Sequence, residues 1–392
     1  MGFRFDYRPG TIRYGEGCVG DLGEELAAVG AENALVVTGR TVGATPAVMD
    51  PVREGLGDRL GGGFAETTPE KRFETAIAGV ERLEATGADA IVAVGGGSSL
   101  DIAKVVAALA ASGTPPGDLH DTFEETGSLA VQPGDLPPVL AVPTTLAGAD
   151  LSMVAGITSR RNGLVRGGAY DERLMPAALL YDPDLFRTTP HGVLCASAMN
   201  GFDKAVETPY AATRTPLTDA TAVRALRLLD RGLPALGDGA RDEVTLHDVV
   251  GTVLAQYGCS RADSLTLSLI HAFGHGIARG YDVQQGGAHA IIAPHALRYL
   301  FAHVDGGRAL LAEGFGVAAD GPEATAEGVV ERVESVRDEL GLPTRLREID
   351  DMAEADLPDV ARDVHGDGLM PYCPEGLDPT VEELEAVLRA AW

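Results

Sequence analysis

The chain has 392 residues, 45% of them hydrophobic, which is enough for two domains with separate cores. Aspartate and glutamate outnumber lysine and arginine by 58 to 31, so the formal net charge is −27. Because the acidic residues are spread along the whole chain, we expect neither nucleic acid nor a membrane as a partner. No apolar run is long enough to span a bilayer, and residues 1–10 lack the apolar stretch of a signal peptide.

Lysine is rare: the 31 basic residues include only Lys71, Lys104 and Lys204. So acidic a chain repels itself at low salt, and dissolved ions screen that repulsion. The composition therefore favours a halophilic protein of a salt-rich cytoplasm over an ordinary acidic enzyme. Four cysteines are scattered without C-x-x-C spacing, at positions 18, 195, 259 and 373. They indicate free thiols in a reducing, cytoplasmic compartment.

Short β-branched runs alternate with helical patterns in the first half of the chain. We predict strands at 34–39, 89–97, 138–145 and 177–182. We predict helices at 20–29, 46–57, 70–86 and 99–112, with Pro46 and Pro69 in first turns. This alternation is typical of a mostly parallel sheet covered by helices, as in Rossmann-like α/β domains.

Beyond residue 188 the strand pattern fades, and amphipathic helices follow. We predict them at 217–230, 244–257, 261–279, 322–340 and 380–391. The sequence therefore predicts an α/β domain over 1–188 and an all-α helical domain over 189–392. Segment 159–168 carries three arginines. We predict a hairpin whose charges face water there, rather than a site for an anionic substrate.

Two turns predict a nucleotide site in the first domain. The segment GGGSSLDIAK at 95–104 follows an apolar strand and opens a helix, whose free N–H groups suit a pyrophosphate. A tight connection without a ligand would explain these glycines equally well. However, the next predicted strand also ends in a turn of small and hydroxyl residues, PTTLAGAD at 143–150. Two such turns on neighbouring strand ends favour a nucleotide.

Cofactor choice depends on the end of the first predicted strand. An acidic side chain there normally accepts the ribose hydroxyls and repels a 2′-phosphate. This chain has Gly39 followed by Arg40 instead. We therefore predict NADP(H), accepted beside NAD(H) or preferred to it. A solvent-facing arginine without a ligand is the alternative.

Five segments together resemble the iron-containing (group III) alcohol dehydrogenase family: the two turns, YDPDL at 181–185, MNGFDKAVE at 199–207 and the histidine-rich stretch 271–299. The resemblance covers nearly the whole chain. It implies a Rossmann-like domain that binds NAD(P)(H), a helical domain and a divalent metal in the cleft between them. It also implies the cofactor contacts: Gly95, Gly96, Gly97 and Ser98 at the pyrophosphate, Asp101 of the same motif, and Thr144, Thr145 and Leu146 near the nicotinamide half.

The metal positions depart from the family pattern. The family's ligands are an aspartate, a histidine four residues later, and two histidines on later segments. The matching positions hold Asn200, Lys204, His271 and Gln285. Because amide carbonyls are weak ligands and a charged lysine repels a cation, we predict no metal. A site shifted onto Asp203, His275 or His289 is the alternative, although Asp203 points about 100° around its helix from Lys204.

The maleylacetate reductase branch of that family is similar in three places: PTTLAGAD, the asparagine of MNGF, and AHAIIAPHALRY. The resemblance implies metal-free reduction of an unsaturated oxo-dicarboxylate. This chain departs from the branch as well, since Lys204 and Gln285 replace histidines that those reductases generally keep. The substrate therefore stays open.

Hydride transfer to a carbonyl needs an electrophile at the oxygen and a proton donor. We predict that Lys204 supplies the positive charge, while His271 and His275, one helical turn apart, donate or relay a proton. Asn200 and Gln285 are predicted to contact a small-molecule substrate. The alternative is that Lys204 only fills a vacated cavity by pairing with a neighbouring carboxylate, Asp203 or Glu207.

Two other function classes compete with a metal-free reductase or alcohol dehydrogenase. One is a metal-using lyase of the dehydroquinate synthase type, and the other is a catalytically silent cofactor-binding protein. The missing metal ligands count against the lyase, and they are the only support for the silent cofactor-binding protein. For the assembled protein we expect a homodimer or a higher homo-oligomer.

Overall fold

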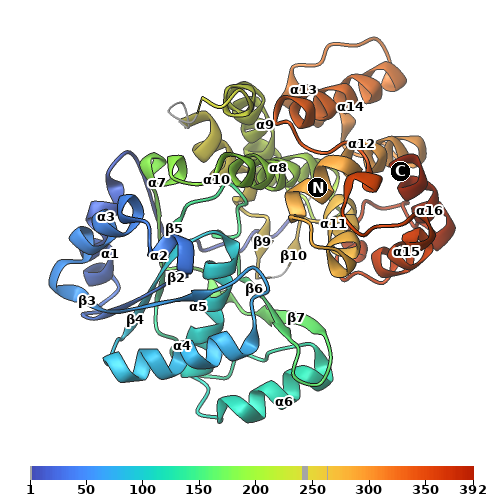
Figure 1. The fold of residues 1–392 in the computed structure, drawn as a ribbon. Helices are drawn as coiled ribbons and strands as arrows, with labels where there is room; N and C mark the ends of the chain where they lie inside the picture. The colour runs from blue at the N-terminus through green and yellow to red at the C-terminus, as the bar shows by residue number, and fades with distance from the viewer. Residues whose placement is uncertain (1, 241–245, 263) are drawn as a thin grey trace. The chain divides into compact units, whose positions relative to one another are not determined.

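The computed structural model describes residues 2–240, 246–262 and 264–392. Its chain forms two compact units (Figure 1). The strand-bearing unit contains residues 6–145 and 149–189, and the helical unit contains residues 2–5, 146–148 and 190–392. Segment 146–148 therefore belongs to the helical unit, although its neighbours on both sides in the sequence belong to the other.

A six-stranded parallel sheet forms the core of the strand-bearing unit, in the order β1-β8-β5-β4-β2-β3. The strands are β1 (Thr11–Tyr14), β2 (Ala34–Gly39), β3 (Leu60–Thr67), β4 (Ala90–Gly95), β5 (Val139–Pro143) and β8 (Ala178–Tyr181). The central strands are buried on both faces, which explains their continuous apolar sequences. The edge strands β1 and β3 were not predicted, because β1 is largely exposed and β3 contains three consecutive glycines.

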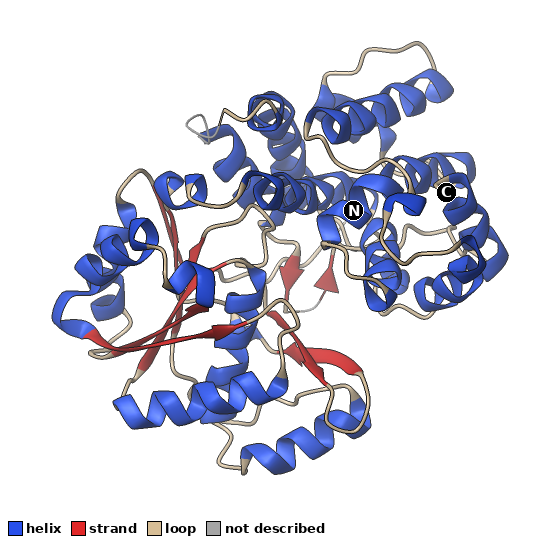
Figure 2. Cartoon of the chain, in the orientation of Figure 1, coloured by secondary structure: helices blue, strands red, loops and turns tan. Residues whose placement is uncertain are grey.

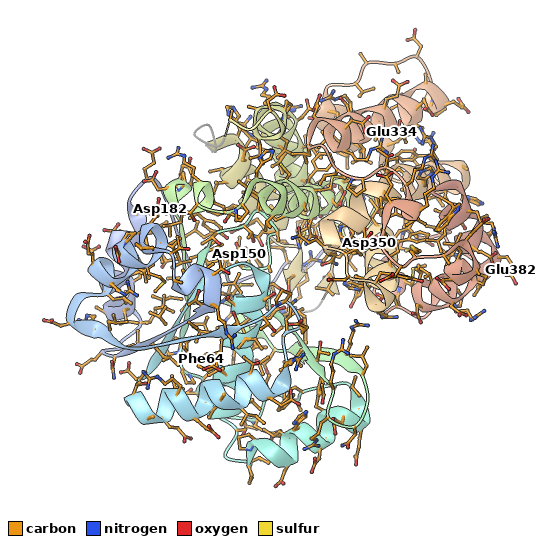
Figure 3. All side chains as sticks on the ribbon, in the orientation of Figure 1. Phe64, Asp150, Asp182, Glu334, Asp350 and Glu382 are labelled. Atoms are coloured by element: carbon orange, nitrogen blue, oxygen red, sulfur yellow. The ribbon has the colours of Figure 1, made fainter. Side chains whose placement is uncertain are left out.

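Helices cover both faces of this sheet. Those of the unit are α1 (Leu22–Ala28), α2 (Arg40–Gly43), α3 (Pro46–Leu56), α4 (Phe73–Thr86), α5 (Gly97–Ala110), α6 (Pro116–Thr126) and α7 (Pro183–Arg187). Helices α1 and α3 share one apolar cluster with β2 and β4, and α4 and α5 pack on the opposite face. Phe64 of β3 lies toward α4 (Figure 3), where a Cβ atom at Gly79 would clash with Val106 of α5, so this glycine lets α4 and α5 approach.

The predicted hairpin is confirmed, since β6 (Val154–Ser159) and β7 (Val165–Tyr170) pair antiparallel. Arg161, just beyond β6, donates to Glu124 at 2.8 Å and also bonds Asp121. Both carboxylates belong to α6, so they already neutralise this guanidinium. An anionic substrate would have to displace them.

The helical unit is built around α8 (His191–Glu207), most of whose residues are buried. The other helices are α9 (Pro216–Gly237), α10 (Gly251–Gln256), α11 (Leu269–Gly280), α12 (Gln285–His303), α13 (Arg308–Phe315), α14 (Pro322–Glu339), α15 (Leu357–His365) and α16 (Val381–Ala390). A short antiparallel pair, β9 (Ser260–Arg261) and β10 (Ser264–Leu265), separates α10 from α11 (Figure 2). Helices α9, α10 and α12 pack on α8.

Three predicted boundaries are wrong or incomplete. The helix predicted over 261–279 begins only at Leu269, because the alternating SLTLS segment takes up extended structure. Pro69 lies ahead of α4 rather than in its first turn, since Lys71 has a φ of 51° and interrupts any earlier helix. Of the helix predicted over 244–257, residues 244 and 245 lie outside the described residues. The rest consists of a π-helical turn, Leu246–Val250, followed by α10.

Two exclusions made from the sequence agree with the structure. All four cysteines are free thiols. Among the described residues, no helix combines the length and the apolar character that crossing a membrane requires.

Lys104 links α5 to the segment that leads into β6. It is fully buried, and its Nζ donates to the carbonyl oxygens of Ser152 at 2.6 Å and of Ala149 and Val154 at 3.3 Å. Replacing it by methionine keeps the apolar stem but removes these charged hydrogen bonds. We expect Lys104→Met to lower the free energy of unfolding by about 2–4 kcal/mol, measured by denaturant titration in high salt. An unchanged unfolding midpoint would contradict this role.

Candidate active site

The glycine-rich turn leaves the N-terminus of α5 uncovered. Gly96 is the N-cap and Gly97 the first residue of α5, and Gly95 has a φ of +137°, which side chains rarely adopt. A Cβ atom at Gly96 would lie 3.1 Å from Thr145, so the turns after β4 and β5 lie against each other. The first turn of α5 holds no acidic residue. Free N–H groups without a nearby carboxylate suit a phosphate group.

The other predicted cofactor residues of this unit differ in accessibility. Ser98 and Thr145 are partly exposed, whereas Thr144 is buried. Asp101 is also buried, and it accepts a hydrogen bond of 2.6 Å from Lys71 Nζ. Sequence reasoning missed this ion pair, because Lys71 lies 30 positions earlier in an irregular segment.

Gly39 and Arg40 lie at the end of β2, where Gly39 is the N-cap of α2. Arg40 is exposed. The backbone of Gly39 is extended with a φ of −81°, and a Cβ atom there would lie 3.4 Å from the Thr67 carbonyl oxygen. An acidic residue would therefore fit, and its absence is a property of the sequence rather than of the backbone.

Segment 146–148 lies on α8. The Leu146 N–H donates to Ser197 Oγ at 3.0 Å, and a Cβ atom at Gly201 would clash with the Leu146 carbonyl oxygen. A Cβ atom at Gly148 would lie 3.2 Å from Lys204 Cε. Leu146, predicted near the nicotinamide, is fully buried in the helical unit. The turn that begins with Thr144 and Thr145 thus reaches Lys204, the residue at one of the family's metal-ligand positions.

Glu207, the last residue of α8, contacts α11. It lies one helical turn after Asp203, the neighbour of Lys204. Its carboxyl group is fully buried, lies 2.5 Å from His271 Nδ1 and accepts a hydrogen bond from the Ile270 N–H at 2.6 Å. The Tyr210 hydroxyl adds another at 3.0 Å. Neither α11 nor its N-cap residue supplies a side-chain cap, so Glu207 takes that role from a different helix.

Asp203 and His289 form a second buried acid–imidazole pair. Both are fully buried, and Asp203 Oδ2 lies 3.1 Å from His289 Nδ1. The His289 ring also contacts the His271 ring edge-on, with centroids 4.4 Å apart. A Cβ atom at Gly274 would clash with His289, so this glycine lets α11 and α12 approach. The sequence indicated His289 as a candidate ligand of a shifted metal site, and it did not predict the contact with Asp203.

The charge of Lys204, which is only 8% exposed, acts on Asp203, His271 and His289. Burial raises the pKa of Asp203 well above its usual range, repulsion from Glu207 adds to the rise, and Lys204 opposes it. Burial lowers the pKa of His271 well below its usual range and that of His289 to about 3, and the Lys204 ammonium acts in the same direction. Both imidazoles are therefore neutral at physiological pH.

The residues at the family's ligand positions do not fit a divalent metal. Asn200 offers only a neutral amide oxygen and Lys204 a positive charge, so His271, whose Nε2 is left bare by the contact of Nδ1 with Glu207, is the one good ligand among the three. Gln285, the first residue of α12, is half-buried and also an amide. Nowhere in residues 2–240, 246–262 or 264–392 do three His, Cys, Asp or Glu side chains form a group suited to a metal. The shifted site proposed as an alternative is thus reduced to the Asp203–His289 pair.

His275 lies on the same helix as His271 but in a different setting. Its side chain is 41% exposed, and its Nδ1 is 3.2 Å from Asp367 Oδ2. Arg279 donates to the same oxygen at 2.8 Å. Asp367 was missed by sequence reasoning, because it lies 92 positions away in a segment without any recognisable pattern.

Comparison with known proteins matches both halves of the chain to one family. The model described as iron-containing alcohol dehydrogenase covers residues 9–183, and the C-terminal model of the Fe-containing alcohol dehydrogenase family covers residues 194–392. The NAD-dependent methanol dehydrogenase of Bacillus methanolicus is 28% identical over 391 residues, with 96% of this chain and 97% of the relative covered.

Two further relatives extend the comparison. The maleylacetate reductase of Burkholderia cepacia is 28% identical, with 81% of each chain covered. The crystal structure of a 1,3-propanediol oxidoreductase superimposes with a TM-score of 0.90 at 25% identity, and both chains are covered completely. The predicted family and the predicted two-part architecture are thereby confirmed.

Restoring the family's ligand types should create a metal site. We expect the triple variant Asn200→Asp, Lys204→His, Gln285→His, which keeps His271, to bind about one Zn²⁺ or Fe²⁺ per chain. The single variant Lys204→His is the control, since two amides would still occupy ligand positions. Metal content is measured by mass spectrometry after equilibration and gel filtration. A wild-type protein that itself retains about one ion per chain would contradict the assignment of the site.

Proposed function

The chain belongs to the iron-containing alcohol dehydrogenase family, and we propose that it is an NAD(P)H-dependent oxidoreductase that works without a catalytic metal. It reduces a carbonyl group, including that of an activated oxo-acid, or oxidises the corresponding alcohol. The observation that carries this proposal is Lys204, buried beside two carboxylates and two imidazoles at a position where the family has a metal ligand. The dehydrogenase and reductase names of the relatives support hydride transfer.

The chemistry requires a positive charge at the substrate oxygen. A bound nicotinamide cofactor would supply the hydride to the carbonyl carbon, and the substrate oxygen would then carry the C=O electron pair and need a proton. A metal would stabilise this negative charge as a Lewis acid. The Lys204 ammonium supplies the same charge, and its burial strengthens the interaction because water screens it little.

Proton transfer falls to the two histidines of α11. His271 is buried, whereas His275 is partly exposed and held by Asp367, so together they donate the proton or relay it from solvent. Asn200 and Gln285 hydrogen-bond the substrate. The residues assigned to the cofactor and to the chemistry lie in different units, and segment 144–148 connects them along the chain.

Metal-dependent alternatives receive less support. An alcohol dehydrogenase with a shifted site and a dehydroquinate synthase-like lyase both need a metal. The Asp203–His289 pair offers only two metal ligands, and the buried Lys204 ammonium beside them repels a cation. A silent cofactor-binding protein would have no need for the ordered acid–imidazole pairs around Lys204.

Loss of the lysine charge should abolish turnover. We expect Lys204→Met to lower kcat by roughly 10²–10⁴-fold, because both the electrophile and its stabilisation of the oxygen are lost. The cofactor KM should change less than kcat, since the pyrophosphate turn at residues 95–98 belongs to the other unit. The measurement is NADPH oxidation with a panel of aldehydes, oxo-acids and oxo-dicarboxylates in high salt. Lys204→Arg is the matched variant that keeps a charge, and it should retain more activity than Lys204→Met; full turnover in Lys204→Met would sink the proposal.

Cofactor choice provides a separate test. We propose that Gly39 and Arg40 admit the 2′-phosphate of NADPH. Gly39→Asp should shift the NADPH/NADH ratio of kcat/KM toward NADH by about 10–100-fold, through repulsion worth roughly 1–3 kcal/mol. Arg40→Ala, which removes the attraction without adding repulsion, should give a smaller shift. A wild-type preference for NADH, unchanged in Gly39→Asp, would contradict this assignment.

A further inference from the structure

Oε1 of Glu207 accepts three hydrogen bonds, from the Ile270 N–H at 2.6 Å, the Tyr210 hydroxyl at 3.0 Å and the His271 backbone N–H at 3.3 Å. Its other oxygen, Oε2, lies 2.5 Å from His271 Nδ1. Three donors on one carboxyl group favour the ionised carboxylate, and Nδ1 then has to be the donor in the fourth contact.

The location of Glu207 also favours its negative charge. The backbone donors are the second and third residues of α11, where unpaired N–H groups and the positive end of the helix dipole attract an anion. Burial raises the pKa of Glu207, while the hydrogen bonds that it accepts hold this rise back.

Asp203, one helical turn earlier on α8, has the opposite surroundings. Oδ2 lies 3.1 Å from His289 Nδ1, but neither oxygen of this fully buried residue accepts a hydrogen bond within the described residues. Two carboxylates this close in a buried site do not both ionise, and the proton goes to the one with fewer donors. Asp203 is therefore the neutral acid of the pair, and Glu207 is the anion.

An ionised Glu207 fixes the tautomer of His271. A neutral imidazole has one N–H and one bare nitrogen, and the hydrogen bond made by the first determines which nitrogen is bare. Because Nδ1 donates to Glu207, Nε2 carries the lone pair. The Nε2 atom is buried and has no hydrogen-bond partner within the described residues.

We propose that Glu207 is a positioning residue that holds His271 in the Nδ1–H tautomer and thereby makes Nε2 the atom that exchanges the proton with the substrate oxygen. This inference rests on the proposed function. In the oxidation direction, Nε2 takes the hydroxyl proton as the hydride leaves the carbinol carbon for NAD(P)⁺, and Lys204 stabilises the oxygen. The imidazolium so formed has Glu207 as its counterion; reduction returns the same proton from Nε2.

The variant Glu207→Gln separates this role from helix capping. Its amide oxygen can still accept the α11 N–H groups, but its NH₂ group then faces His271 Nδ1 and requires a bare nitrogen there. The variant should therefore invert the tautomer, leaving the proton on Nε2. We expect kcat to fall roughly 10²–10⁴-fold, with the cofactor KM unchanged.

The tautomer is measured by ¹⁵N NMR of histidine-labelled protein, with the His271 signals assigned by their loss in His271→Gln. We expect Nδ1–H in the wild type and Nε2–H in Glu207→Gln. Tyr210→Phe is the control, since it removes one donor to the same carboxylate and should keep both the Nδ1–H tautomer and a kcat close to wild type. The thermal unfolding temperature of each variant shows whether residue 207 still caps the N-terminus of α11.

Either of two results overturns the inference: Nε2–H at His271 in the wild type, or wild-type kcat in a Glu207→Gln variant whose tautomer is inverted. The wild-type spectrum decides the first point even if Glu207→Gln does not fold. A confirmed Nδ1–H tautomer in a protein that oxidises NADPH with none of the carbonyl compounds would overturn the proposed function instead, while leaving the placement of the proton supported.

Discussion

A buried positive charge at Lys204 is the constraint on which the rest of the helical unit's site depends. An ammonium group in a poorly solvated interior needs a nearby anion, and its field discourages any second cation. The proposed arrangement meets both conditions: the N-terminal N–H groups of α11 favour an ionised Glu207, while burial and Lys204 favour neutral His271 and His289. In the proposed function, the same field opposes binding of the divalent metal that gives the family its name.

Close helix packing makes this arrangement possible, and glycines permit the packing. Gly274 lets the His289 ring lie against α11, and Gly201 lets the Leu146 carbonyl lie against α8. Gly148 brings a turn of the chain onto the Lys204 side chain. These three contacts fix the rings and the lysine within one layer around α8, so the acid–imidazole pairs depend on backbone approach as much as on their own chemistry.

The sequence predicts the parts of the fold that show a local pattern. Strands β2, β4, β5 and β8 are apolar runs, and their ends are predicted to within two residues. Strand β3 was not predicted because Gly61, Gly62 and Gly63 have no side chains that show a strand pattern. The helix predicted from residue 261 began too early because the two-residue alternation around Ser264 and Leu265 was interpreted as helical. Burial and pairing in the folded chain decide these segments, and local propensity does not report either.

The candidate site divides in the same way. Lys204 and His271 are recognisable in the sequence because they occupy positions of a known motif. The sequence does not reveal that Glu207 and Asp367 contact His271 and His275, because each contact joins segments more than 60 positions apart. Nothing local indicates that Glu207 caps a distant helix, or that the carboxylate of Asp203 is turned inward to His289.

The most direct test of the account measures NADPH-dependent carbonyl reduction and metal content in the same preparation, after dialysis against a chelator in high salt. The account predicts that turnover per chain is unchanged by removal of metal and is not increased by added Fe²⁺ or Zn²⁺. Turnover that falls in proportion to the metal removed, and returns when the metal is restored, would contradict it.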